Sequence, residues 1–145
     1  MTINQAQDEI IDEFAFLGDD WEQKYEYIID LGKRLAPMPV DLKTDLNKIK
    51  GCQSQVWIHP SVLNGIVHFE GDSDAIIVRG LVAMVLRVVN GHAPAELAMA
   101  DLYFPQRIGM DRHLAPTRSN GLAAMIKQIK LYGIALSASK RGQDN

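Results

Sequence analysis

A single cysteine carries the chemistry that this sequence offers. Cys52 is the only cysteine in 145 residues, so the chain has one soft nucleophile. Gly51 precedes it and frees the backbone there, while Lys48 and Lys50 place two cations nearby. Nearby cations favour the thiolate, which is the form of cysteine that attacks. The pattern predicts a reactive loop thiol. The alternative is a small, inert, buried thiol, as many free cysteines are.

The same cysteine count excludes several kinds of site. One cysteine can form no disulfide within the chain and cannot supply the thiolates of a zinc or iron–sulfur centre. The histidines are too far apart in sequence to form a metal-binding pair on one helix; they are His59, His68, His92 and His113. We therefore expect no resident metal or cofactor.

Charge is distributed unevenly along the chain. The net charge is −3, which argues against a broad nucleic-acid-binding surface. Residues 1–30 contain nine acidic side chains and one lysine, whereas residues 31–145 contain 14 basic and nine acidic side chains. Such an asymmetry can orient a protein partner, and the acidic first helices are one surface that a basic patch on the partner could meet.

Neither a secretory signal peptide nor a membrane-spanning segment is expected. The first dozen residues are polar and acidic, and the longest stretch without formal charge, residues 51–69, contains several polar residues and a proline. We expect a cytoplasmic protein in which the lone thiol stays reduced.

The length and the 47% share of hydrophobic residues fit one soluble domain over residues 1–145. Helical periodicity covers about residues 4–36 and ends at two prolines. Strand-forming residues on either side of Asn64-Gly65 predict a β-hairpin over about residues 53–71. A further strand should pair with this hairpin, because two strands alone are marginally stable in water.

Two more helices are predicted after the hairpin. A helix over about residues 74–90 would be apolar on nearly every side, which is typical of a buried helix. A last helix should span about residues 118–138 and be followed by a polar tail over 139–145. Together these elements predict an α+β fold in which helices cover a small antiparallel sheet.

The residues around the cysteine resemble those of a known family. The segment Gly51-Cys52-Gln53-Ser54-Gln55-Val56-Trp57 is similar to the signature loop of the SufE family of cysteine-desulfuration proteins. Three other segments resemble the family in the same order: residues 21–32, 71–81 and 118–125. The resemblance covers about residues 20–135, and the cysteine loop shows no departure from the family pattern.

The resemblance implies both a fold and a function. The fold would be the one that the family shares with iron–sulfur scaffold proteins. The function would be to accept persulfide sulfur on Cys52 from a SufS-like cysteine desulfurase, to stimulate that enzyme, and to pass the sulfur to a SufBCD-like iron–sulfur scaffold. The pyridoxal phosphate would belong to the desulfurase, and the carrier would be a monomer or a weak homodimer without independent desulfurase activity.

Two residues are candidates for supporting Cys52. The cation of Arg118 could orient the cysteine loop or steady a persulfide anion; otherwise it is a solvated first-turn arginine. Asp74 is favoured as an N-cap of the buried helix, together with Asp72 and Ser73 as cap candidates. The alternative for Asp74 is a place beside the cysteine loop, where it would tune the opening of the loop.

Three other functions stay open at the level of sequence. A cluster scaffold is disfavoured because clusters usually take four protein thiolates or close substitutes. A binding module with an inert cysteine would need the thiol to be buried and unreactive. A carrier that stimulates a desulfurase for another thiolation pathway would use the same cysteine chemistry.

Overall fold

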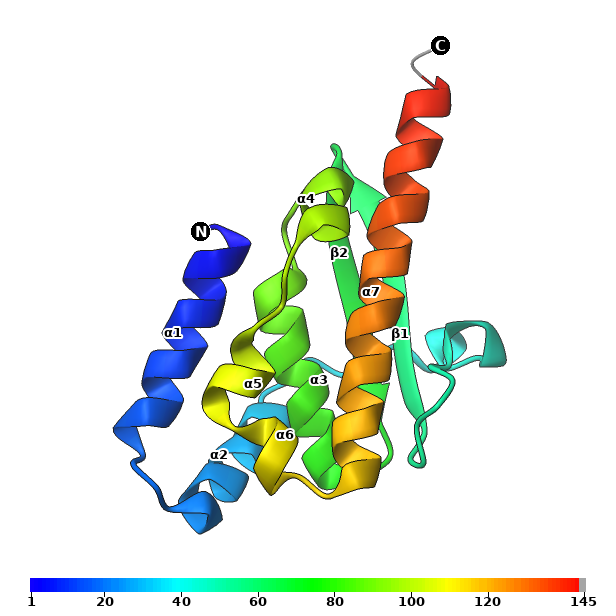
Figure 1. Cartoon of the computed structure of the whole chain (residues 1–145). Coiled ribbons are helices and arrows are strands. Elements are labelled where there is room, and N and C mark those ends of the chain that lie inside the picture. Colours follow the sequence, from blue (N-terminus) through cyan, green and yellow to red (C-terminus); the bar gives the residue numbers. More distant parts are fainter. Residues whose placement is uncertain (144–145) are drawn as a thin grey trace.

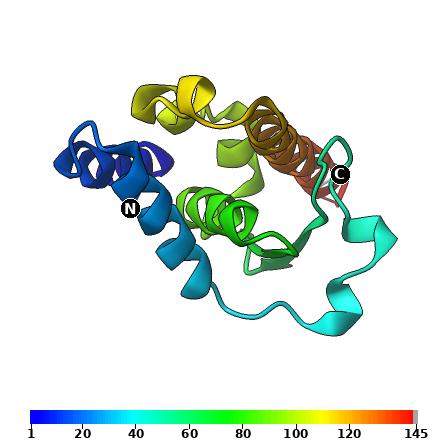
Figure 2. The same cartoon turned by 90° about the horizontal axis from the view of Figure 1, so that it is seen from below.

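Helices and one antiparallel hairpin pack around a central helix (Figure 1). The structure is a computed structural model that describes the backbone of residues 1–143 and the side chains of residues 1–139. Helix α3 (Ile76–Val89) lies between α2 (Trp21–Lys33) and α7 (Pro116–Gln143), as Figure 2 shows. The predicted α+β class, a small antiparallel sheet covered by helices, is confirmed.

The first two helices begin at capping residues. The side chain of Thr2 accepts a hydrogen bond from the Gln5 amide and caps α1 (Ile3–Phe16). Asp20 accepts from the amides of Glu22 and Gln23 and caps α2. These two helices span residues 3–33, close to the predicted helical region of about 4–36.

The hairpin consists of β1 (Val56–Leu63) and β2 (Ile66–Ser73). Asn64 and Gly65 both have positive φ, as a two-residue hairpin turn requires. The expected third strand is wrong for the described residues 1–143, where the sheet has two strands and only isolated bridges beside them. The stabilisation that a third strand would add comes from helices: α3 packs on β2, and Tyr132 of α7 lies 6.3 Å, centroid to centroid, from Phe69.

Helix α3 forms the centre of the core, as its apolar sequence predicts. Its buried residues are Val78, Gly80, Leu81, Val82, Met84, Val85, Leu86, Val88 and Val89. It packs closely on α2, where a Cβ built on Gly80 would lie 2.1 Å from the Ile28 carbonyl oxygen. Glycine at position 80 therefore sets how near the two helices come.

A group of ion pairs and hydrogen bonds, called the polar brace below, connects the end of β2 to these helices. Asp72 is buried and pairs with Lys43 at 3.0 Å and with Arg79 at 3.5 Å. The Arg79 guanidinium also donates to the carbonyl oxygens of Gly32 and Leu35 at the end of α2. Because a buried carboxylate is stable only when it is paired, this brace fixes where the chain leaves the sheet.

The remaining helices connect α3 to the C-terminal region. They are α4 (Pro94–Met99), α5 (Phe104–Ile108) and α6 (Met110–His113), and the earlier connection after α2 contains the short 3₁₀ turns η1 (Val40–Leu42) and η2 (Asp45–Asn47). Helix α7 begins two residues before the predicted start and continues to Gln143. The prediction of a polar tail after the helix is therefore wrong for residues 139–143, which are helical. Residues 144–145 of that tail lie outside the described part. None of the helices described is both long and apolar enough to cross a membrane.

The contact between α2 and α3 gives a stability prediction. Gly80→Ala should lower the free energy of unfolding by at least about 2 kcal/mol, because the new methyl group has no room against the Ile28 carbonyl. Helix propensity alone would change stability in the opposite direction by about 1 kcal/mol. Urea denaturation followed by circular dichroism measures the difference. An unchanged or raised unfolding midpoint would contradict the close contact.

Candidate functional site around Cys52

Cys52 lies in a loop whose two ends are tied together. The Ile49 amide donates to the Val56 carbonyl oxygen at 2.8 Å, and the residues between them form the loop ahead of β1. Gly51 has φ of +88°, a conformation that favours glycine. The loop is therefore closed at its base, with the cysteine between the tied ends.

The thiol is half-buried against α7. Its Sγ lies 3.8 Å from the carbonyl oxygen of Gly121, and a Cβ built on Gly121 would lie 3.5 Å from the sulfur. The sulfur lines a pocket of about 420 Å³ whose walls come from the loop, the start of α3 and the start of α7. The lining residues include Ser54, Ile77, Thr117 and Arg118. The cysteine is thus neither sealed in the core nor fully exposed.

Burial raises the pKa of the Cys52 thiol above its ordinary value. The expectation that Lys48 and Lys50 favour the thiolate is wrong for this resting conformation. Both lysines line a separate hollow of about 570 Å³, whereas the Cys52 pocket contains neither of them. Desolvation of the sulfur therefore decides the protonation state, and the resting thiol is protonated near neutral pH.

Asp74 holds the end of the cysteine loop and does not cap α3. Its carboxylate accepts a hydrogen bond from the Gln55 amide at 2.9 Å, and its own amide donates to the Gln55 carbonyl oxygen at 3.2 Å. The N-cap of α3 is Ala75, without a side-chain hydrogen bond at the cap. The favoured capping role is corrected because β2 runs to Ser73, so the next residue still faces the beginning of β1.

Arg118 reaches the Cys52 pocket from the first turn of α7. It is exposed and forms no ion pair with the side chains of residues 1–139. The structure thus brings Arg118 and Cys52 to one pocket, while Asp74 contacts the loop through Gln55. Sequence reasoning did not single out Gly121 as a site residue. The sign available in the sequence was a glycine within a helical pattern, three residues after Arg118, which can mark a close approach to the helix.

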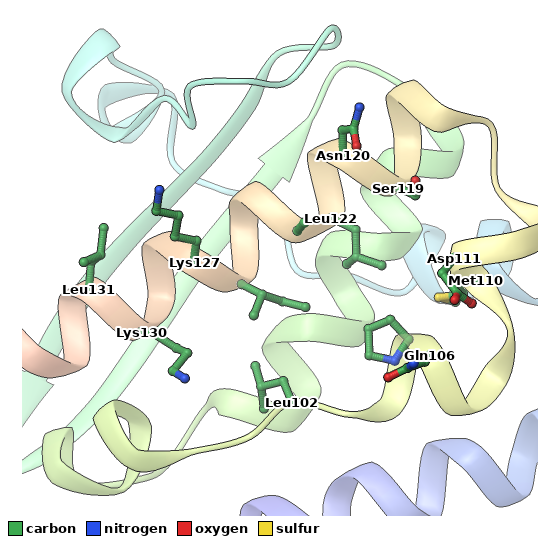
Figure 3. A pocket seen from close by; sticks show the side chains of 13 residues that line it. Leu102, Gln106, Met110, Asp111, Ser119, Asn120, Leu122, Lys127, Lys130 and Leu131 are labelled. Atoms are coloured by element: carbon green, nitrogen blue, oxygen red, sulfur yellow. The ribbon is translucent and has the colours of Figure 1, made fainter.

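A larger hollow of about 730 Å³ lies along α7, between this helix and α5 with α6 (Figure 3). Apolar side chains line much of it, including Leu102, Met110, Leu122 and Ile126. Cys52 is not among the lining residues. Within the described side chains, no group of three or more His, Cys, Asp or Glu residues is placed to hold a metal ion.

Comparison with known proteins gives a consistent family match. The SufE family, described as the Fe–S metabolism associated domain, matches residues 8–132. An uncharacterised SufE-like protein of Rhizobium etli is 48% identical over 128 residues, which cover 85% of this chain and 86% of that protein. A second, from Rhizobium meliloti, is 47% identical over 85% of this chain and 91% of its own length.

A solved structure shares the fold. It is the solution structure of a hypothetical protein from Thermus thermophilus, with a TM-score of 0.75 and 17% sequence identity. The similarity covers 92% of this chain and 96% of that one. At this identity the likeness concerns the fold alone.

The burial of Cys52 predicts how alkylation depends on pH. Iodoacetamide reacts with the thiolate, so a raised pKa shifts the rise in rate to higher pH than for an exposed cysteine, whose pKa is about 8.5. The rate is measured by intact mass across the pH range, with a short peptide containing the loop sequence as the control. A midpoint for the protein below that of the peptide would contradict the buried resting thiol.

The hydrogen bond that the Asp74 carboxylate accepts from the Gln55 amide gives a prediction about the mobility of the loop. Asp74→Ala should speed the alkylation of Cys52 by about tenfold, because losing a hydrogen bond to a charged acceptor removes roughly 1.5 kcal/mol of restraint on the loop. Asp45→Ala removes an exposed carboxylate that bonds to no loop residue and serves as the control. Equal rates in the wild type and both variants would show that Asp74 does not restrain the loop.

Proposed function

Because this chain belongs to the SufE family, whose domain is associated with Fe–S metabolism, we propose that Cys52 accepts sulfur from the persulfide of a cysteine desulfurase and passes it to an iron–sulfur scaffold. The observation that carries the proposal is the position of Cys52. Its sulfur lies in a pocket, on a loop tied at its base, with part of its surface open to solvent. This arrangement supports a cysteine that holds a cargo and can be reached by a partner.

The proposed step is an exchange at sulfur. The Cys52 thiolate attacks the outer sulfur of the partner's persulfide, and a new S–S bond forms as the partner's S–S bond breaks. The electron pair of the broken bond leaves on the partner's cysteine thiolate. One S–S bond replaces another, so no external oxidant or reductant is needed.

The raised pKa of Cys52 gives the resting state a clear property. A protonated, half-buried thiol is a weak nucleophile, so the free protein is protected from unwanted oxidation. Attack requires the thiol to lose its proton and to leave the Gly121 carbonyl. We infer that docking of the desulfurase supplies both changes by drawing the loop outward.

The pocket suits the product of the exchange. A persulfide adds one sulfur atom to Cys52, and the pocket of about 420 Å³ has room for it. Among the described residues that line the pocket, Arg118 is the one cation, which supports a role in balancing the charge of a persulfide anion. Asp74 would act as a positioning residue, since it holds Gln55 at the end of the loop.

One cysteine also protects the cargo. A second thiol beside a persulfide would attack it and release sulfide as a disulfide formed. This chain contains no other cysteine, so that reaction cannot occur within one molecule. Sulfur then stays bound until an acceptor protein removes it.

The proposal predicts that sulfur becomes attached to Cys52. After incubation with a SufS-like desulfurase and cysteine, the intact mass should rise by one sulfur atom, and the increase should be reversed by a thiol reductant. The same protein should accelerate cysteine turnover by the desulfurase. Cys52→Ser should lose both effects while keeping the circular dichroism and melting temperature of the wild type.

Two outcomes would contradict this function. If the wild type never gains sulfur, Cys52 is not an acceptor. If Cys52→Ser stimulates the desulfurase as strongly as the wild type, the protein acts without the cysteine.

A further inference from the structure

Four lysines line two hollows along α7. Lys48 and Lys50 precede the cysteine, and Lys127 and Lys130 project from α7. Lys48, Lys50 and Lys127 line the hollow of about 570 Å³, and Lys127 and Lys130 line the hollow of about 730 Å³. We call these four residues the lysine face.

The charges of the lysine face are not neutralised within the described part of the chain. Lys48, Lys50 and Lys127 are exposed, and none of the four lysines forms an ion pair with a side chain in residues 1–139. Lys43, by contrast, is paired with Asp72. Two carboxylates line these hollows beside the four lysines, that of Asp45 in the smaller and that of Asp111 in the larger. The face therefore keeps an excess of positive charge for a partner.

Apolar surface adjoins these cations. Leu46 is 88% exposed and Leu131 is 47% exposed, and both line the hollow that contains Lys48 and Lys50. Leu131 also borders the larger hollow, where Figure 3 shows Lys127 and Lys130 leaving α7 in different directions. Exposed leucines beside unpaired lysines favour a partner that brings both apolar groups and carboxylates.

The opposite side of the molecule has the opposite charge. Helices α1 and α2 lie across α3 from α7, and residues 1–30 hold nine acidic side chains and one lysine. Acidic side chains thus gather on α1 and α2, where Glu9 and Glu13 pair with Arg87, and the lysine face is at the other end of the molecule. A negatively charged surface would be steered toward that end, and away from α1.

We propose that the lysine face docks the cysteine desulfurase through a segment of that enzyme in which acidic and apolar side chains are interspersed. The inference rests on the proposed function of Cys52 and names the surface that the function uses. Lys50 is two residues from Cys52, so a segment bound there pulls directly on the cysteine loop. The apolar side chains of the segment fill the hollows on either side of Lys127.

Charge reversal tests this surface. Lys127→Glu/Lys130→Glu should raise the concentration of this protein that half-saturates desulfurase stimulation by about tenfold or more, with the maximal rate unchanged. For the wild type, this concentration should rise between about 50 mM and about 300 mM NaCl, and for the variant it should not. Lys127→Arg/Lys130→Arg keeps the charge and should behave as the wild type.

The matched control reverses two exposed cations elsewhere. Lys33→Glu/Arg112→Glu makes the same change in net charge on α2 and α6 and should leave the half-saturating concentration within about twofold of the wild type. Melting temperature and the alkylation rate of Cys52 show whether each variant keeps the native fold. A normal fold with weakened docking is the expected result for the lysine-face variant.

The outcomes separate this inference from the proposed function. If the wild type neither gains sulfur nor stimulates the enzyme, the proposed function fails. If the wild type does both and Lys127→Glu/Lys130→Glu has an unchanged half-saturating concentration, the lysine face is not the docking surface. If the half-saturating concentration rises only when the charges of Asp12 and Asp19 are reversed, docking belongs to the acidic helices and the inference is overturned.

Discussion

Partial burial of the Cys52 sulfur is the constraint on which the rest of the structure depends. The proposed sulfur transfer requires a thiol that is kept away from solvent oxidants and can still be presented to two partners. The contact with the Gly121 carbonyl and the pocket formed with α3 and α7 meet the first need. The loop between Ile49 and Val56 suits the second, because it precedes the paired residues of β1 and β2, whose register begins at Val56.

The frame that holds this loop is rigid for identifiable reasons. Gly80 lets α3 approach α2, and Arg79 joins the end of α2 to Asp72 at the end of β2. The next residue but one, Asp74, then holds Gln55. A series of contacts thus runs from the helix pair to the cysteine loop.

Much of the fold follows from patterns that are local in sequence. Asn64-Gly65 predicts the hairpin, and the apolar run after it predicts a buried helix, because both depend on neighbouring residues. The missing third strand was not predictable in this way, since the burial that replaces it comes from α3 and α7, which are distant in sequence. The end of α7 was misjudged because polar composition alone does not end a helix.

The candidate site was predicted in part. Cys52 and Arg118 were found from residue type and family resemblance, and the structure places both at one pocket. The prediction that Lys48 and Lys50 favour the thiolate was wrong, because closeness in sequence does not show on which side of a loop a side chain lies. The role of Asp74 depended on whether β2 ends at residue 71 or 73, and strand ends are the least predictable feature of a sequence.

The most direct test of the central claim follows the sulfur atom in time. The desulfurase is mixed with ³⁵S-cysteine and this protein, the reaction is stopped at intervals, and the label is mapped to peptides under conditions that preserve persulfides. The account predicts that label appears on the peptide containing Cys52 before free sulfide appears, and leaves it when an iron–sulfur scaffold is added. Label that passes from the desulfurase to sulfide or scaffold without occupying Cys52 would contradict it.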